Sequence, residues 1–158
     1  MTYRSQLKQS DVAAIGEIVR STGFFHDYEI DIAQELAEEN LAKGEEQSGY
    51  IFIIAEKDEK PVAYSCYGKT PGTLDSYDLY WIAVHQDLKG SGIGKELMRL
   101  TETDIARLGG KNIWIETSSR DIYEPTRQFY LKRACEKIAE LPDFYAANDN
   151  KVIFLKRV

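Results

Sequence analysis

The sequence predicts a single α/β domain in which strands and helices are mixed along the chain. Runs rich in β-branched and aromatic residues alternate with segments whose apolar residues recur every three or four positions. The chain has 158 residues and contains no repeats or low-complexity tracts. A chain of this length buries roughly 70% of its unfolded surface. We therefore expect residues 1–158 to form one domain with its own core.

Caps and breakers set the expected elements of the first half. Ser10 is a suitable N-cap, because its hydroxyl can accept from a backbone N–H of the first helical turn. Gly23 and Gly44 are suited to end helices. The expected order is a strand at 2–7, a helix from Ser10 to before Gly23, an aromatic loop at 21–29, a helix ending near Gly44, and strands at 49–56 and 61–68 around a turn at 57–60.

Glycine and proline also divide the second half. A strand at 76–84 precedes a glycine-rich turn and a helix, which Gly109 and Gly110 stop. Pro125 is tolerated in the first turn of a helix. The remaining expected elements are a strand at 112–117, a helix through Phe129 and Leu131, and strands at 136–141 and 151–157 joined by residues 142–150.

The composition argues against several classes of partner and site. The formal net charge is −6, whereas general nucleic-acid and acidic-membrane binders depend on clustered lysine and arginine. No apolar run approaches the ~20 residues of a membrane span, and the N-terminus lacks a signal-peptide core. Cys66 and Cys135 match no metal-ligand spacing. We expect reduced thiols in a cytoplasmic protein without a bound metal.

Residues 83–97, AVHQDLKGSGIGKEL, place alternating glycines between a predicted strand and a predicted helix. The N-terminus of a helix offers unpaired N–H groups and partial positive charge, and glycine lets the backbone approach a phosphate closely. The spacing is too short for a Walker A loop, and Lys95 stands where the dinucleotide fingerprint needs its third glycine. The segment is either a pyrophosphate cradle flanked by Lys89 and Lys95 or a flexible surface turn.

The longer stretch YWIAVHQDLKGSGIGKELM resembles motif A of the GNAT family of N-acetyltransferases, whose pattern is Gln/Arg-x-x-Gly-x-Gly/Ala. Lys89, Gly92 and Gly94 occupy its positions, with lysine in place of glutamine or arginine. The resemblance extends over nearly the whole chain. It implies a mixed, mostly antiparallel central sheet of about seven strands, splayed between the fourth and fifth strands and flanked by about four helices.

A second stretch, TRQFYLKRACEKIAEL, is similar to motif B of the same family. Phe129 and Tyr130 match its aromatic pair, whereas Ala134 and Cys135 replace its Gly-Phe pair. The resemblance implies that Tyr130 donates a proton to the departing thiolate. The alternative is that Tyr130 only packs beside Phe129.

The resemblance also implies acetyl-CoA as the donor. The edge of the strand at residues 82–84 would pair with the pantetheine arm, and a bulge near Val84 would offer an N–H to the thioester carbonyl. Tyr123 lies where some members have a cofactor-binding asparagine, and Arg127 lies near the cofactor or is simply solvated. The implied cofactor-binding residues are Ile82, Ala83, Val84, Lys89, Gly90, Ser91, Gly92, Ile93, Gly94, Lys95, Tyr123 and Arg127.

Amine acetylation needs a base, because an alkyl ammonium with a pKa near ~10 is mostly protonated at neutral pH. Glu116 follows an apolar run on a predicted strand, on the same face as Trp114 by alternation. Asp78 lies on the preceding predicted strand. Relatives carry a catalytic glutamate at each of these places. Glu116 is slightly favoured over Asp78, and a water chain without a dedicated base remains open.

The expected activity is transfer of the acetyl group of acetyl-CoA to a primary amine of a small molecule or peptide, by direct attack in a ternary complex. In the family, the loop between the first two helices lines the acceptor site, so Phe24, Phe25 and Tyr28 are candidate substrate-binding residues or merely cover the sheet. A non-catalytic acyl-CoA-binding regulatory domain is the alternative, and the acidic charge disfavours a modifier of aminoacyl-tRNA. We expect no nucleic-acid or membrane partner, and a homodimer is compatible with the resemblance.

Overall fold

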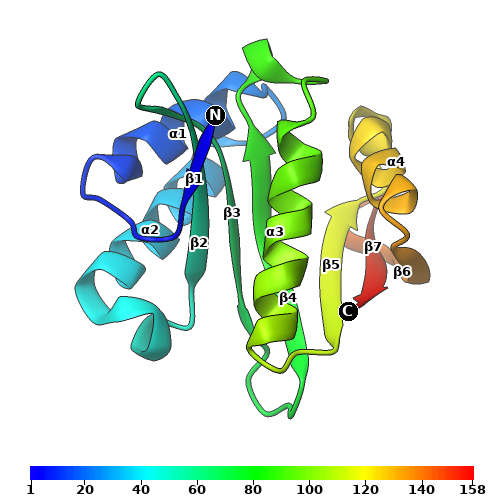
Figure 1. Ribbon diagram of the computed structural model, residues 1–158. Helices are drawn as coiled ribbons and strands as arrows, with labels where there is room; N and C mark the ends of the chain where they lie inside the picture. Colours follow the sequence, from blue (N-terminus) through cyan, green and yellow to red (C-terminus); the bar gives the residue numbers. More distant parts are fainter. The chain divides into compact units, whose positions relative to one another are not determined.

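The computed structural model describes residues 1–158 and contains seven strands, four α-helices and two short 3₁₀ helices (Figure 1). The expected alternation of strands and helices is therefore present. The elements are β1 (Thr2–Arg4), α1 (Asp11–Ser21), α2 (Asp27–Ser48), β2 (Ile51–Lys57), β3 (Lys60–Lys69), β4 (Ser76–Val84), η1 (Gln86–Leu88), α3 (Ile93–Arg107), β5 (Asn112–Ser118), η2 (Asp121–Tyr123), α4 (Glu124–Lys132), β6 (Glu136–Ala146) and β7 (Asp149–Arg157).

The strands form one sheet in the order β1-β2-β3-β4-β5-β7-β6. The pairs β1–β2, β2–β3, β5–β7 and β6–β7 are antiparallel, and β4–β5 is parallel. The register of β4 with β5 joins Ser76–Leu79 to Asn112–Ile115 and ends there, although β4 continues to Val84. The predicted mixed, mostly antiparallel sheet with four helices is confirmed.

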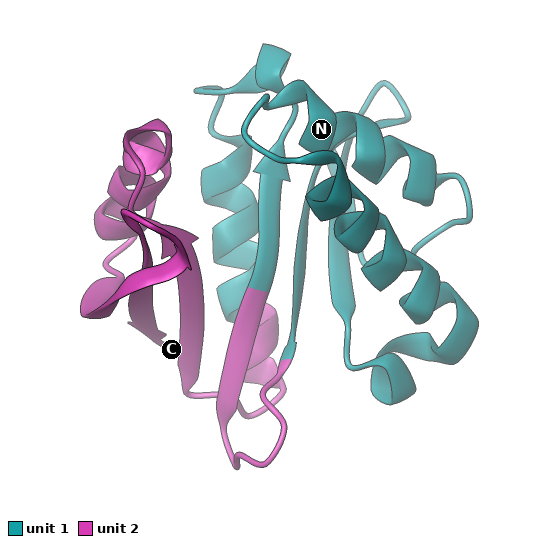
Figure 2. Cartoon of the chain, turned by 180° about the vertical axis from the view of Figure 1, so that it is seen from behind, with its two compact units in different colours: residues 1–68, 80–103 teal, residues 69–79, 104–158 magenta.

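The chain divides into two compact units (Figure 2). The first unit contains residues 1–68 and 80–103, and the second contains residues 69–79 and 104–158. β4 and α3 each contribute residues to both units. That the whole chain behaves as one domain remains a prediction.

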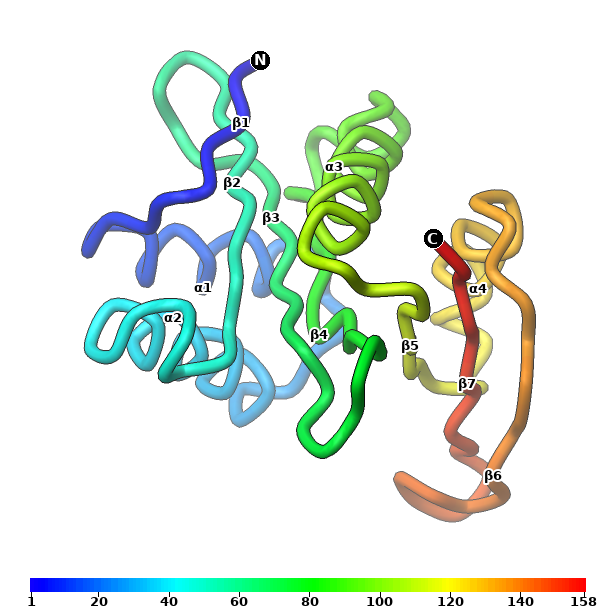
Figure 3. Tube along the Cα trace, turned by 60° about the horizontal axis from the view of Figure 1, so that its bottom comes forward, coloured from blue at the N-terminus to red at the C-terminus, as the bar shows by residue number.

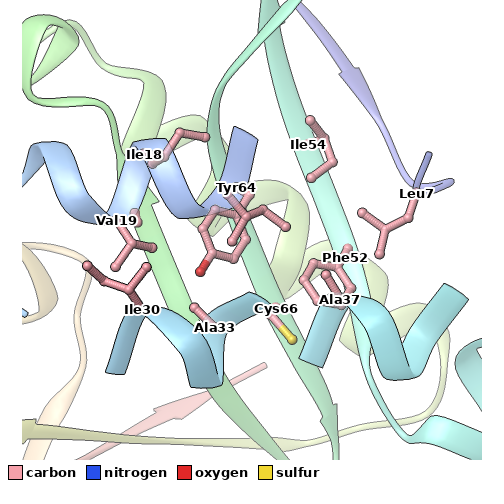
Figure 4. Close-up of a cluster of buried hydrophobic side chains, with 12 residues drawn as sticks. Leu7, Ile18, Val19, Ile30, Ala33, Ala37, Phe52, Ile54, Tyr64 and Cys66 are labelled. Carbon is pink, nitrogen blue, oxygen red and sulfur yellow. The ribbon is translucent and has the colours of Figure 1, made fainter. Parts of the chain in front are cut away.

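In the first unit, α1 and α2 cover one face of the strands and α3 covers the other (Figures 1 and 2). The first face is apolar: Ile18 and Val19 of α1 and Ile30 of α2 meet Phe52 and Tyr64 of the sheet in one buried cluster (Figure 4). The other face carries a polar contact, because the hydroxyls of Ser65 on β3 and Thr101 on α3 lie 2.8 Å apart and are both buried.

A buried charge network joins β1, α1 and β2 in the first unit. The guanidinium of Arg4 donates to both carboxylate oxygens of Asp11, at 2.6 and 2.7 Å, and also to Glu56. Asp11 is fully buried and accepts a further bond from the N–H of Lys8 at 2.7 Å. The hydrogen bonds that Arg4 donates to Asp11 are the main reason that the pKa of Arg4 is raised. The network therefore compensates a carboxylate that has no access to water.

In the second unit, β6 and β7 form a long hairpin beside β5, and α4 lies against one face of these strands (Figure 3). Tyr130 of α4 packs on Phe154 of β7, with ring centroids 5.6 Å apart. Phe154 is directly opposite Ile115 in the antiparallel register, so these side chains share the face that α4 covers. No helix of the chain is long and apolar enough to span a bilayer.

Several predicted details of the elements are wrong. The first strand ends at Arg4 rather than at residue 7, and α2 continues past a kink at Gly44 to Ser48, where Gly49 caps it. Ser10 precedes α1, but its backbone is already helical (φ −65°, ψ −17°) and its side chain caps nothing, since an N-cap hydroxyl needs an extended backbone to reach the first turn. Most of the expected loop at residues 142–150 is strand, with the turn at residues 147–148. Pro142 fits there because β6 is the edge strand, where a missing N–H breaks no ladder.

Candidate active site

The glycine loop, residues 89–95, joins the end of η1 to the first turn of α3 in the first unit. Gly90 and Gly92 have φ angles of 79° and 88°, in the left-handed region that favours glycine. The N–H of Glu96 donates to the carbonyl of Gly92 at 3.1 Å, so the N–H groups before it in the first turn have no helical carbonyl to bond. The N–H of Ser91 donates instead within the loop, to the carbonyl of Leu88 at 3.3 Å.

This loop fits a diphosphate. A Cβ atom at Gly90 or Gly92 would meet no other atom within 4 Å, so the conformation rather than crowding requires glycine, and the backbone is open on that side. An anion that accepts from the free N–H groups of the first turn would also meet the positive end of the α3 dipole. No cluster of metal-ligating side chains is present in the chain.

The two lysines that flank the glycine loop differ in their surroundings. The ammonium of Lys89 lies over the ring of Phe24, 4.2 Å from its centroid, and partial burial lowers the pKa of this lysine. Lys95 is exposed. The contact brings a predicted cofactor-binding residue and a predicted acceptor-binding residue together within the first unit.

The other two aromatic candidates for acceptor binding, Phe25 in the loop between α1 and α2 and Tyr28 in the first turn of α2, lie in two different environments. The Phe25 ring packs edge-on against Trp81 of β4, with centroids 5.0 Å apart, and both rings border the buried cluster. Tyr28 is 63% exposed and stacks on His26, whose side chain belongs to the capping box of α2. Phe25 therefore supports the sheet as well as lining its edge, and only Tyr28 projects into solvent.

β4 departs from regular alternation near its middle. Tyr80 contacts Tyr50, which borders the cluster beneath α1 and α2, with ring centroids 5.4 Å apart. The next residue, Trp81, borders the same cluster. Neighbouring residues of a regular strand point to opposite faces, so the strand has a local irregularity at these two positions. The sequence analysis expects a bulge near Val84; the irregularity seen from the side chains lies earlier.

Ile82, Ala83 and Val84 form the end of β4 that precedes the glycine loop. Ala83 is buried in the cluster, whereas Ile82 and Val84 are half-buried. The chain then turns at His85, whose N–H donates to the carbonyl of Val62 at 2.8 Å and whose imidazole accepts from the N–H of Asp87 at 3.2 Å. His85 thus caps η1.

Tyr130 is the buried residue of α4, with 6% of its surface exposed. Its ring lies between Phe129 and Phe154, each 5.6 Å away between centroids. Burial raises the pKa of Tyr130 far above its usual value, and the nearby Cys135 raises it further. The phenol consequently stays protonated over the whole neutral and mildly basic range and can act as a proton donor.

Both candidate bases lie on the face of the second unit opposite Tyr130. Asp78 of β4 is in register with Trp114 of β5, and Glu116 follows two residues later on the same side. Ile115, between them, shares the face that carries Phe154 and Tyr130. The sequence prediction that Glu116 and Trp114 share a face agrees with this register.

Lys151 of β7 pairs with Glu116, a contact that the sequence analysis missed. Its ammonium lies 2.9 Å from a carboxylate oxygen of Glu116 and 3.9 Å from the centroid of the Phe144 ring. The Lys151 side chain is only 14% exposed, whereas that of Glu116 is 54% exposed. The pairing depends on the register of β5 with β7, for which the sequence carries no signal.

The last two predicted residues lie around the start of α4. Tyr123 is half-buried at the end of η2 and precedes the helix. The guanidinium of Arg127 donates to the carbonyls of Ser118 and Arg120, at 2.7 and 2.9 Å, and pairs with Glu124 at 2.7 Å. Arg127 therefore joins the end of β5 to α4, which gives it a structural role whether or not it also contacts a cofactor.

The comparisons with known proteins agree on one family. The model of the acetyltransferase (GNAT) family matches residues 15–136. None of the curated proteins matches the chain in sequence. A solved structure from Desulfovibrio desulfuricans, described as a GNAT-family acetyltransferase, is similar with 40% identity and a TM-score of 0.96, over 99% of this chain and 98% of that chain.

More distant solved structures share the fold. An aminoglycoside 6'-N-acetyltransferase in complex with coenzyme A has 17% identity and a TM-score of 0.79, over 99% of this chain and 97% of that chain. The ribosomal-protein-S18-alanine N-acetyltransferase of Escherichia coli has 18% identity and a TM-score of 0.76, over 99% of this chain and 93% of that chain. Their named acceptors differ, so likeness of fold alone does not indicate the acceptor of this chain.

Proposed function

The chain belongs to the GNAT acetyltransferase family, and from this premise we propose that it transfers the acetyl group of acetyl-CoA to a primary amine of a small molecule or peptide. The amine attacks the thioester carbonyl directly, in a complex that holds both substrates. The observation that carries the proposal is the glycine loop, whose left-handed Gly90 and Gly92 precede the open N-terminus of α3. We also propose a cytoplasmic location, in line with the two free, buried cysteines.

Acetyl-CoA supplies the activated acyl group, and the first unit supplies its binding elements. The N–H groups from Gly92 to Lys95 would bind the pyrophosphate, and Lys89 would leave the Phe24 ring or share its charge with a phosphate. The edge of β4 at Ile82–Val84, where pairing with β5 has ended, would bind the pantetheine arm. These contacts position the thioester without reacting with it.

The second unit supplies the proton chemistry in this proposal. Glu116 or Asp78 would accept the proton of the attacking amine, directly or through water. Tyr130 would donate its phenolic proton as the carbon–sulfur bond breaks, so that coenzyme A leaves as a thiol. Within the second unit, the base candidates and Tyr130 lie on opposite faces of the strands, so the two proton-transfer groups are separate.

The test combines turnover with cofactor binding. Purified protein is incubated with acetyl-CoA and a panel of primary amines, and the release of free thiol is followed. In parallel, Gly92→Val should weaken acetyl-CoA binding at least ~10-fold, about 1.4 kcal/mol, because a β-branched residue strains the left-handed loop. Gly72→Val is the matched control, since Gly72 has the same open surroundings and a φ of 77° but lies outside the glycine loop.

A folded Gly92→Val protein with unchanged affinity for acetyl-CoA would contradict the proposal that the glycine loop binds the pyrophosphate. Tight binding of acetyl-CoA without turnover of any amine on a broad panel would instead favour a non-catalytic acyl-CoA-binding domain. Both measurements use the full chain, and calorimetry reports the affinity independently of turnover.

A further inference from the structure

One face of the second unit combines acidic, basic and aromatic groups. Asp78, Trp114 and Glu116 follow one another on β4 and β5, and the alternation places them on the side away from α4. Glu116 is exposed and Trp114 is half-buried, so part of this face is open to a ligand. An amine that is to meet either candidate base must approach this face.

Lys151 provides the positive charge on this face. Its register partner on β5 is Ser118, two residues beyond Glu116, and its side chain reaches back to the Glu116 carboxylate at 2.9 Å. The Phe144 ring covers the ammonium from another side, at 3.9 Å. An ammonium has three N–H donors, and Glu116 accepts from one of them, so Lys151 can also bind a second anion.

The pair constrains the charge of an acceptor. An amine without an acidic group would bring a cation to a carboxylate that Lys151 already neutralises, and it would face the like charge of the partly buried ammonium. A zwitterion avoids both costs. The ammonium of the zwitterion can pair with Glu116, and its carboxylate can pair with Lys151. The site then holds two ion pairs instead of one, and its net charge is unchanged.

We propose that the Glu116–Lys151 pair selects acceptors that carry a carboxylate close to the amine, so that the acceptor class is free amino acids. This inference rests on the proposed function and narrows its acceptor. Lys151 holds the acceptor carboxylate while Glu116 or Asp78 takes the proton from the neighbouring ammonium, and the resulting neutral amine attacks the acetyl group. Lys151 is a specificity-determining residue and takes no proton itself.

The experiment compares matched acceptors that differ only in the carboxylate. Glycine, leucine and phenylalanine are each titrated against their own carboxamides, by calorimetry on the full chain in the presence of coenzyme A. Each amino acid should bind at least ~10-fold more tightly than its carboxamide, and kcat/KM for acetyl transfer should follow, mainly through KM. A carboxamide also resembles a peptide bond, so the same pairs test peptide N-termini as acceptors.

Variants assign the preference to Lys151. Lys151→Met keeps the length of the side chain and removes its charge, and it should bring the binding ratio of amino acid to carboxamide close to one. Lys151→Arg should restore the preference. Lys137→Met is the matched control, because Lys137 also pairs with a glutamate, at 2.6 Å, but lies in register with Phe154 on the face that α4 covers; it should keep the preference.

The outcomes separate the inference from the proposed function. Equal or no binding of every amino acid and its carboxamide would overturn the inference, even if other amines are acetylated. A preference that survives in Lys151→Met would overturn it as well. Selective binding of amino acids through Lys151, without acetyl transfer to any acceptor, would support the inference and contradict the proposed enzymatic activity.

Discussion

Tyr130 shows how burial sets the chemistry of a single side chain. Because its pKa is raised, the phenol remains protonated at pH values where an exposed tyrosine begins to ionise. If it donates to the leaving thiolate, Tyr130→Phe should lower kcat by roughly 10²–10⁴-fold while the affinity for acetyl-CoA changes far less. The wild-type pH–rate profile should show no loss of activity near pH ~10 that depends on Tyr130.

The check is single-turnover kinetics beside calorimetric titration of acetyl-CoA. Phe129→Leu is a suitable comparison, because it removes the neighbouring ring contact without removing a hydroxyl. Equal turnover of Tyr130→Phe and wild-type protein would leave Tyr130 with only its packing role beside Phe154.

At the residue scale, sequence reasoning succeeded where the requirement is local. The left-handed angles of Gly90 and Gly92 follow from the turn that they occupy, and they were predictable from spacing. The Glu116–Lys151 contact was not, because the partners are brought together by the register of β5 with β7. That register follows the β6–β7 hairpin, whose irregular pairing between Leu141 and Ala146 has no signature in the sequence.

At the element scale, the buried Arg4–Asp11 pair fixes β1 against the start of α1. Asp11→Ala should lower the free energy of unfolding by about 3 kcal/mol, because it removes the bidentate partner of the partly buried Arg4, leaves Glu56 as the one carboxylate of the network, and deprives the Lys8 N–H of its acceptor. Chemical denaturation measures the change. The exposed Glu39–Lys43 pair on α2 is the control: Glu39→Ala there should have no measurable effect. Equal stability of both variants and the wild type would mean that Glu56 alone compensates the charge of Arg4.

The start of α1 shows which parts of a helix boundary the sequence predicts. Ser10 occupies the N-cap position, but its backbone is helical and its hydroxyl makes no capping bond, whereas Asp11 accepts from the Lys8 N–H before the helix and pairs with Arg4. Most strands and helices were predictable, because their apolar residues recur at a regular spacing over a long segment. The edge strand β6 has no buried face, so its sequence carries no such regular spacing.

At the scale of the whole molecule, the negative charge is concentrated in one element. α2 contains Lys43 as its only basic residue and carries acidic side chains at Asp27, Glu29, Asp31, Glu35, Glu38, Glu39, Glu45 and Glu46. The rest of the chain is therefore close to neutral, although the total is −6. The negative net charge argues against binding of polyanions by the molecule as a whole. It does not prevent a phosphate from binding at the glycine loop, because the field there is local.

The salt dependence of acetyl-CoA binding tests this local view. Replacing Lys89 and Lys95 together by glutamine should raise the dissociation constant and flatten its dependence on ionic strength, because the fields that recruit the phosphates are short-ranged in salt. The control replaces Lys57 and Lys60, two exposed lysines of the β2–β3 hairpin, in the same way and keeps the total charge equal. Identical slopes in the two double variants would show that the loop lysines face away from the phosphates.

The interleaving of the two units along the chain has a consequence for synthesis on the ribosome. The first unit is complete in sequence once residue 103 has left the exit tunnel, whereas the second unit waits for β7. At that point residues 69–79, which belong to the second unit, have also been made, while their partner strand β5 has not been translated. Vectorial synthesis thus delivers the glycine loop to the nascent chain before the strands that carry Glu116 and Lys151 exist.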